Sequence, residues 1–262
     1  RFFDVGIAEQ HAVTLAAGMA KSGMKPVVAI YSSFLQRAYD QILHDVALQN
    51  LHVVFAIDRA GVVGEDGETH HGLYDISYLN HIPNMSILAP GDYSEFEEMI
   101  EYAVLKHEGP IAIRYPKGTG KEKLFETEPI KPGRGLLLRE GKDLTLIAAG
   151  DMVETALNVA EMLSELGYSI EVINPRFIKP VDEKLILNSA AKTGKLVTIE
   201  DNSVKGGFGS SVLEVVNQHD IKCMVRIIGF PDKPVTHGSR SELLRLFGLD
   251  AETIKNKVLS YL

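Results

Sequence analysis

Short apolar runs rich in Val and Ile alternate along this 262-residue chain with longer amphipathic segments, and this alternation limits the folds open to it. The apolar runs occupy residues 27–31, 51–58, 86–89, 111–115, 144–150, 169–174, 196–201 and 223–230. They are continuously apolar, which is typical of parallel strands covered on both faces. Segments with helical spacing separate them, at residues 8–22, 34–50, 93–107, 153–166, 182–193, 209–219 and 239–247. The sequence therefore predicts an α/β fold with mostly parallel sheets and right-handed crossovers.

One stretch breaks this rhythm and indicates a division into two domains. Residues 117–142 are rich in glycine, proline and charged side chains and have no apolar period, which is typical of a connection between domains. We place the linker at residues 121–134, between a first domain over residues 1–120 and a second over residues 135–262. Each is expected to be doubly wound, with a mostly parallel sheet between layers of helices.

Charge and cysteine content exclude several classes of protein. A formal net charge of −8 gives the chain as a whole no attraction to nucleic-acid phosphates or anionic membranes. No apolar run approaches the roughly 18 residues of a membrane-spanning helix. The single cysteine, Cys223, cannot form an internal disulfide, so a secreted cystine scaffold is excluded and we expect a cytoplasmic protein. The chain opens with RFFDV, neither Met nor a signal peptide, which we interpret as a missing front part.

Polar side chains gather in the loops that follow the apolar runs of the first domain, where open α/β sheets bind ligands. Arg37 and Arg59 follow the first two runs, and Arg114 lies near the end of the fourth. His70 and His71 lie in the long loop after the second run. Arginine forks bind anions well, and histidine titrates near neutral pH. These loops therefore predict an anion site with a titratable group beside it.

Taken singly, several of these features have simpler structural explanations. Glu9 at the start of a helix could merely oppose the helix dipole, and Arg37 could pair with an acidic residue of its own helix. The acidic loop at residues 65–71 could be a metal cluster, but its spacing matches no zinc motif and its glycines favour a flexible substrate loop. The glycine-rich turn at residues 206–210 lacks a full phosphate-binding motif, so close packing explains it better.

The order of seven sequence blocks gives these separate signals a common explanation. The blocks are residues 5–11 (VGIAEQH), 29–41 (AIYSSFLQRAYDQ), 58–61 (DRAG), 69–72 (THHG), 114–118 (RYPKG), 174–180 (NPRFIKP) and 200–202 (EDN). In this order they resemble the 1-deoxy-D-xylulose-5-phosphate synthase family, thiamine-diphosphate enzymes of the transketolase superfamily. The first block marks the superfamily, whereas the second and third are specific to the synthases. The resemblance covers essentially the whole chain.

The resemblance implies a protein of three α/β domains, of which this chain matches two. They are the middle, pyrimidine-binding domain without its first elements and the C-terminal domain, which serves mainly assembly. The motif that holds Mg²⁺ and the cofactor diphosphate would belong to an N-terminal domain, in the same or another chain. We therefore expect thiamine diphosphate and Mg²⁺ as cofactors, no metal ligand on these 262 residues, and a homodimer.

The resemblance also assigns roles to individual residues in the condensation of pyruvate with D-glyceraldehyde 3-phosphate. The product would be 1-deoxy-D-xylulose 5-phosphate, a precursor of isoprenoids, thiamine and pyridoxal. Glu9 and His70 are the expected catalytic residues, because a carboxyl group can bond the pyrimidine and a histidine can move a proton. The cofactor would contact Glu9, Phe34 and Arg37. The substrate would contact Tyr31, Arg59, Asp66, His70 and Arg114.

His71 departs from the family pattern as we know it, which makes His70 the better catalytic candidate. Two alternatives remain open. The chain could be another superfamily subunit, of a split transketolase or a 2-oxo acid dehydrogenase β-chain, although these lack the DRAG block. It could also be a non-catalytic assembly subunit, which the intact set of candidate residues disfavours.

Overall fold

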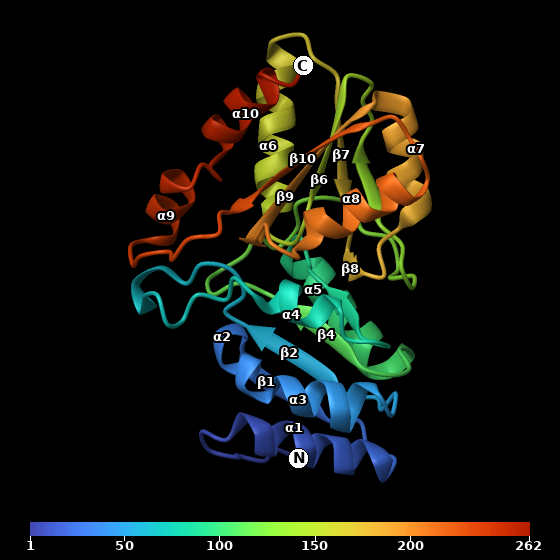
Figure 1. The fold of residues 1–262 in the computed structure, drawn as a ribbon, viewed down its shortest axis with the longest axis vertical. Coiled ribbons are helices and arrows are strands. Elements are labelled where there is room, and N and C mark those ends of the chain that lie inside the picture. The colour runs from blue at the N-terminus through green and yellow to red at the C-terminus, as the bar shows by residue number, and fades with distance from the viewer.

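A computed structural model describes all residues, 1–262. It contains two five-stranded sheets, which lie one after the other along the long axis of the molecule (Figure 1). The first sheet has the order β1 (Val27–Tyr31), β2 (Val54–Asp58), β4 (Ile111–Arg114), β3 (Ser86–Leu88) and β8 (Phe177–Lys179). The second has the order β10 (Met224–Phe230), β9 (Lys195–Ser203), β6 (Leu144–Ala148), β7 (Ile170–Asn174) and β5 (Leu136–Arg139). Only β8 and β5 are antiparallel to their neighbours. The predicted α/β fold with mostly parallel sheets is therefore confirmed.

Helices of the first half follow the order α1 (Glu9–Lys21), α2 (Ser32–Leu35), η1 (Gln36–Ala38), α3 (Tyr39–Gln41), η2 (Ile42–Ala47), η3 (Gly64–Asp66), α4 (Asp75–Asn80), α5 (Tyr93–Glu101) and η4 (Tyr102–Lys106). The predicted helical segment at residues 34–50 is thus a succession of short pieces ending in the π-helix η2. The apolar spacing of this segment nevertheless predicts which of its side chains are buried, because Leu35, Ala38, Ile42 and Val46 all lie in the core.

The second half contains α6 (Met152–Glu165), α7 (Glu183–Thr193), α8 (Phe208–Gln218), α9 (Arg240–Leu246) and α10 (Ala251–Leu259). Figure 1 shows α6, α9 and α10 beside one face of the sheet and α7 and α8 beside the other, as expected of a doubly wound unit. Side chains of Asp182, Ser239 and Asp250 cap the first turns of α7, α9 and α10. None of the helices has the length and apolar character required to cross a membrane.

Strand β8 crosses from the second half of the chain into the first sheet. It pairs antiparallel with β3, and the Lys179 ammonium donates to the carbonyls of Asn80 and Ile82. The NPRFIKP block, residues 174–180 of the second half, therefore adds an edge strand to the sheet of the first half, which the sequence did not predict. A three-residue strand leaves too short a pattern to be found from sequence. The extent of the two domains and of the linker stays a prediction.

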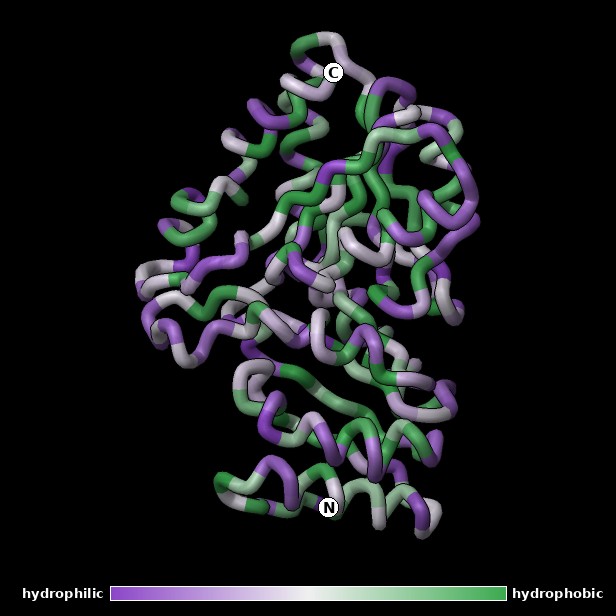
Figure 2. The backbone as a smooth tube through the Cα atoms, in the orientation of Figure 1, coloured by the Kyte–Doolittle hydropathy of each residue, from purple (hydrophilic) through white to green (hydrophobic).

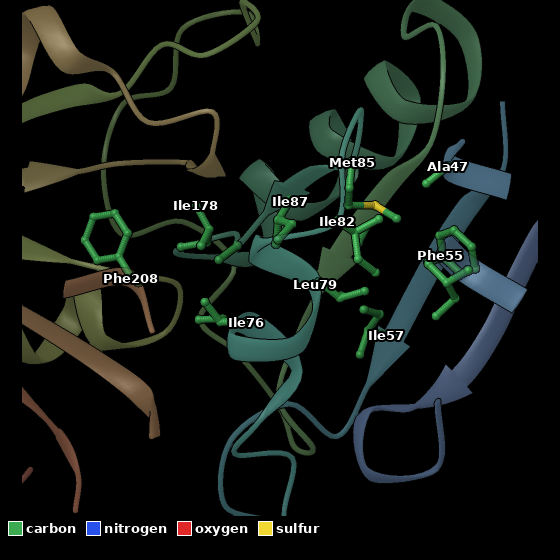
Figure 3. Packing of buried hydrophobic residues seen from close by; sticks show 14 of the residues in the cluster. Ala47, Phe55, Ile57, Ile76, Leu79, Ile82, Met85, Ile87, Ile178 and Phe208 are labelled. Carbon is green, nitrogen blue, oxygen red and sulfur yellow. The ribbon is translucent and has the colours of Figure 1, made fainter. Parts of the chain in front are cut away.

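One continuous core joins the two sheets. The largest cluster of buried apolar residues contains Ile76 and Ile87 of the first half together with Ile178 and Phe208 of the second, and Figure 3 shows these side chains in the region where the two halves meet. In Figure 2 the hydrophobic segments follow the strands, while the connecting loops are mostly hydrophilic. The loop after β2 lies against the segment between β10 and α9 (Figure 1), where His71 Nε2 is 3.0 Å from the Thr236 carbonyl.

Candidate active site

The candidate site lies where the carboxyl ends of β1 and β2 meet. Tyr31, the last residue of β1, is in register with Asp58, the last residue of β2. Arg59 follows with a left-handed backbone (φ 58°), and its guanidinium carbon lies 3.8 Å from the centroid of the Tyr31 ring. Its Nη1 donates to Asp58 Oδ2 at 2.6 Å. The pairing of β1 with β2 thus places an arginine over an aromatic ring at the sheet edge.

Phe34, on α2 immediately after β1, is the centre of an aromatic cluster. Its ring stacks on Tyr31 with centroids 5.4 Å apart and an interplanar angle of 17°. The His70 ring meets it edge-on at 5.1 Å, and the Arg37 guanidinium carbon lies 5.0 Å from its centroid. Side chains from β1, η1 and the loop after β2 therefore converge on one flat apolar ring.

Glu9 opens α1 and lies beside this cluster, with 8% of the residue exposed. Arg37 Nη1 donates to Glu9 Oε1 at 2.8 Å, so Arg37 pairs with the glutamate rather than with an acidic residue of its own helix. Glu9 Oε2 has no partner within the chain. A half-satisfied, nearly buried carboxyl group next to an aromatic ring can bond one more polar group of a planar ligand.

Asp66 and Lys117 form an ion pair across the mouth of the site. Lys117 Nζ donates to Asp66 Oδ2 at 2.6 Å, and this hydrogen bond lowers the pKa of the Asp66 carboxyl. Lys117 was not among the predicted site residues. Its place in the RYPKG block, three residues after Arg114, was the available signal. Part of its side chain is exposed, so it can also reach a ligand.

Arg114 does not join the site, contrary to the predicted substrate contact. Its side chain is only 3% exposed, and its Nε donates to the buried Asp75 Oδ2 at 2.7 Å. Its Nη2 donates to the carbonyl of Asp201. Although burial alone would lower the pKa of Arg114, the adjacent Asp75 carboxylate raises it. Nε and Nη2 of Arg114 are thus engaged in an internal ion pair, which makes a direct contact with a substrate phosphate less favourable.

His70 and His71 have different surroundings. His70 is partly exposed, and its Nδ1 lies 3.0 Å from the Thr69 hydroxyl. His71 is buried, accepts at Nδ1 from the Val63 amide, and places Nε2 3.0 Å from the Thr236 carbonyl. Both nitrogens of His71 are occupied within the chain, whereas His70 Nε2 is not. This favours His70 as the histidine that can meet a ligand.

Three buried polar atoms at the same strand ends have no partner in the chain. They are Ser32 Oγ, Ser33 Oγ and Arg59 Nε. Buried donors without partners cost free energy, and they commonly mark the place of a polar ligand. No group of three or more His, Cys, Asp or Glu side chains lies close enough together to hold a metal ion.

The glycine-rich turn at residues 206–210 is filled by the protein itself. Both Phe208 and Gly209 donate their amides to the Glu200 carboxylate, at 2.7 and 2.9 Å. Burial raises the pKa of Glu200 to about 7. A Cβ on Gly207 would lie 2.2 Å from Glu200 Oε2, so this turn needs glycine for close packing.

Comparison with protein families gives two matches that together cover most of the chain. The family described as the transketolase pyrimidine binding domain matches residues 1–122, and the transketolase C-terminal domain family matches residues 133–254.

Curated relatives are named 1-deoxy-D-xylulose-5-phosphate synthase. The one from Heliobacterium modesticaldum is 53% identical over 97% of this chain, and the one from Pelotomaculum thermopropionicum is 55% identical over 99%. A third, from Chlorobaculum tepidum, is 53% identical over the full chain. The chain spans only 39–41% of the length of these relatives.

Solved structures agree with this assignment. A structure described as a split-gene transketolase in an inactive β4 tetramer is 33% identical, with a TM-score of 0.89, over 99% of this chain and 83% of its own. The transketolase of Campylobacter jejuni shares the fold, with 21% identity and a TM-score of 0.78 over 98% of this chain and 39% of its own. The chain therefore belongs to the transketolase superfamily, with 1-deoxy-D-xylulose-5-phosphate synthases as its curated relatives, and spans the pyrimidine-binding and C-terminal domains.

Proposed function

We propose that this chain supplies the pyrimidine half of the active site of a 1-deoxy-D-xylulose-5-phosphate synthase. The reaction would join pyruvate to D-glyceraldehyde 3-phosphate with release of CO₂. The observation that carries the proposal is the convergence of Glu9, Arg37, Phe34, Tyr31, Arg59 and His70 at one sheet edge. Sequence identity above 50% to enzymes of that name supports it.

Three residues fit the aminopyrimidine of thiamine diphosphate. Phe34 offers an aromatic ring for stacking, and Glu9 Oε2 is free to bond a ring nitrogen. Arg37 holds the Glu9 carboxyl in place through Oε1. When bound, thiamine diphosphate supplies the carbon centre on which a 2-oxo acid loses CO₂. The residues of this chain would bind and orient the pyrimidine, and Glu9 would hold a proton shared with its ring nitrogen.

Cations at the mouth of the site fit a phosphorylated aldehyde. The Arg59 side chain is partly exposed and its buried Nε has no partner in the chain, and Lys117 is the second accessible cation, in place of the buried Arg114. A phosphate that binds both cations would compete with Asp66 for Lys117. The Tyr31 ring packs against the Arg59 guanidinium. His70, which contacts Phe34, would hold or move a proton at the substrate oxygens.

The diphosphate and Mg²⁺ would be held by an N-terminal domain, since the relatives are more than twice as long as this chain. Assembly into a cytoplasmic homodimer is part of the same proposal. Support for an interface comes from large apolar side chains around α1 and the edge strand β1, with Phe2 and Ile7 more than 90% exposed and Met24 and Val27 about half exposed.

A split transketolase subunit is the second candidate. It is favoured by the solved structure of that description, of which this chain covers 83%. The two candidates differ in the donor they use, because a transketolase takes a ketose phosphate whereas the synthase takes pyruvate.

Reconstitution with an N-terminal domain from a relative tests the proposal. The assembled enzyme, supplied with thiamine diphosphate and Mg²⁺, should form 1-deoxy-D-xylulose 5-phosphate and CO₂ from pyruvate and D-glyceraldehyde 3-phosphate. The Phe34→Ala variant serves as a matched control that should lose this activity while it keeps the fold. Activity with xylulose 5-phosphate as donor and none with pyruvate would overturn the proposal in favour of a split transketolase.

A further inference from the structure

The loop that carries Arg59 and His70 is fastened to the C-terminal half of the chain. Asp201 Oδ1 accepts the Val62 amide at 3.2 Å, and the Ser203 amide donates to the Leu73 carbonyl at 2.8 Å. These contacts lie just inside the two ends of the loop, on strand β9 of the other sheet. The second half of the chain therefore helps to hold this loop, in addition to the contacts that the first half provides, such as Lys117 with Asp66.

The loop has a neck, formed by Gly61 and Gly72. Each donates its amide to the other's carbonyl, both at 2.7 Å. Arg59 lies two residues before the neck, and His70 lies two residues before its other side. Any movement of the neck therefore moves both candidate substrate residues together.

Asp201 packs directly against this neck. A Cβ on Gly61 would lie 2.1 Å from Asp201 Oδ2, which shows how closely the carboxylate approaches the loop backbone. The same Oδ2 accepts from Arg240 Nη2 at 2.6 Å, and Arg240 also pairs with Asp151. Asp201 is 1% exposed, so Arg240 on one side and the Val62 amide on the other fix its orientation.

We propose that Asp201 is a positioning residue for the loop between β2 and α4, which we call the substrate loop. By holding the Gly61–Gly72 neck, it determines the positions of Arg59 and His70. The C-terminal domain then contributes to the geometry of the site and not only to assembly. As a statement about catalysis this rests on the proposed function, because it takes Arg59 and His70 to meet the aldehyde substrate.

Asp151 offers a matched control. Asp151 and Asp201 both pair with Arg240, but only Asp201 also accepts from the loop. Asp201→Ala removes the anchor and one partner of Arg240, whereas Asp151→Ala removes only a partner of Arg240. A difference between the two variants therefore isolates the contact with the loop. Asp201→Asn keeps an acceptor for the Val62 amide, so it should disturb the loop less than Asp201→Ala does.

Amide hydrogen exchange on the 262-residue chain tests the anchoring without any ligand. Asp201→Ala should speed exchange over residues 60–73 by about tenfold or more, since a hydrogen bond to a charged acceptor is lost. In Asp201→Ala, the exchange rates in α1 should stay unchanged. In Asp151→Ala, the exchange rates in the loop should change by less than about twofold. Equal exchange in the two alanine variants, or an unchanged loop in Asp201→Ala, would overturn the anchoring.

Kinetics of the assembled enzyme test the consequence. Asp201→Ala should raise KM for D-glyceraldehyde 3-phosphate by about tenfold and leave KM for pyruvate within about twofold. A loosened loop without a change in the aldehyde KM, or an equal rise for both substrates, would overturn the positioning role. If the unaltered assembled enzyme makes no product, the proposed function fails, while the exchange measurement still decides the anchoring.

Discussion

Replacing Arg114 with leucine should destabilise this chain by about 3–5 kcal/mol, because the Asp75 carboxylate would be left buried without its partner. Both side chains are almost fully inaccessible to water, at 3% and 1% exposure. The substitution also removes the hydrogen bond from Arg114 Nη2 to the Asp201 carbonyl. A buried carboxylate without a partner is unfavourable, because the protein then returns little of the solvation it loses.

Urea denaturation of the 262-residue chain, followed by circular dichroism, measures this loss. Lys123→Ala is the matched control, because Lys123 also forms an ion pair, with Glu126, but on the surface. Its removal should cost less than about 1 kcal/mol. The double variant Asp75→Leu/Arg114→Leu should recover much of the stability, because a buried pair replaced by apolar side chains is often neutral.

The same variant separates the two roles considered for Arg114. If Arg114 bound the substrate phosphate, its loss would raise the KM for D-glyceraldehyde 3-phosphate and leave the stability of the fold nearly unchanged. A loss of less than about 1 kcal/mol together with such a rise in KM would refute the buried-pair explanation.

Three further outcomes are expected. In the assembled enzyme, Glu9→Ala should lower kcat by orders of magnitude while cofactor affinity, measured by titration calorimetry, falls far less; near-normal turnover at saturating cofactor would contradict its role. Arg59→Ala and Lys117→Ala should each raise KM for D-glyceraldehyde 3-phosphate about tenfold, with pyruvate little affected, and equal damage to both substrates would indicate a structural role. Since the pKa of Glu200 is raised to about 7, this group favours folding most below about pH 4.5, and its contribution falls as the pH rises through 7. Between pH 5 and pH 8 the free energy of unfolding, measured by urea denaturation, should therefore fall less in Glu200→Gln than in the unaltered chain, by up to about 3 kcal/mol. The same pH dependence in both proteins would refute this contribution of Glu200.

The parallel sheets could be predicted because strands buried on both faces leave continuous apolar runs, such as residues 111–115 and 144–150. Strand β8 could not, because it has three residues and its partner β3 lies about 90 residues earlier in the chain. Periodicity reports which side chains are buried and says little about which distant segment they meet.

The candidate site shows the same limit. Its position at the strand ends followed from the fold, and the sequence blocks pointed to Glu9, Phe34 and Arg59. The pairing of Arg37 with Glu9 depends on residues 28 positions apart, which no helical spacing reveals. Arg114 and Lys117 lie three residues apart in one block, and only the position of Asp75 in space shows which cation is buried.

Titration calorimetry of thiamine diphosphate with Mg²⁺ tests most directly whether this chain holds only the pyrimidine half of the site. For the 262 residues alone we expect no binding at micromolar cofactor, because stacking on Phe34 and one bond to Glu9 cannot offset the cost of immobilising the whole cofactor. Addition of an N-terminal domain from a relative should restore both binding and the release of CO₂ from pyruvate, and Glu9→Ala should abolish that release. Tight binding by the 262-residue chain alone, or CO₂ release that survives Glu9→Ala, would contradict this division of the site.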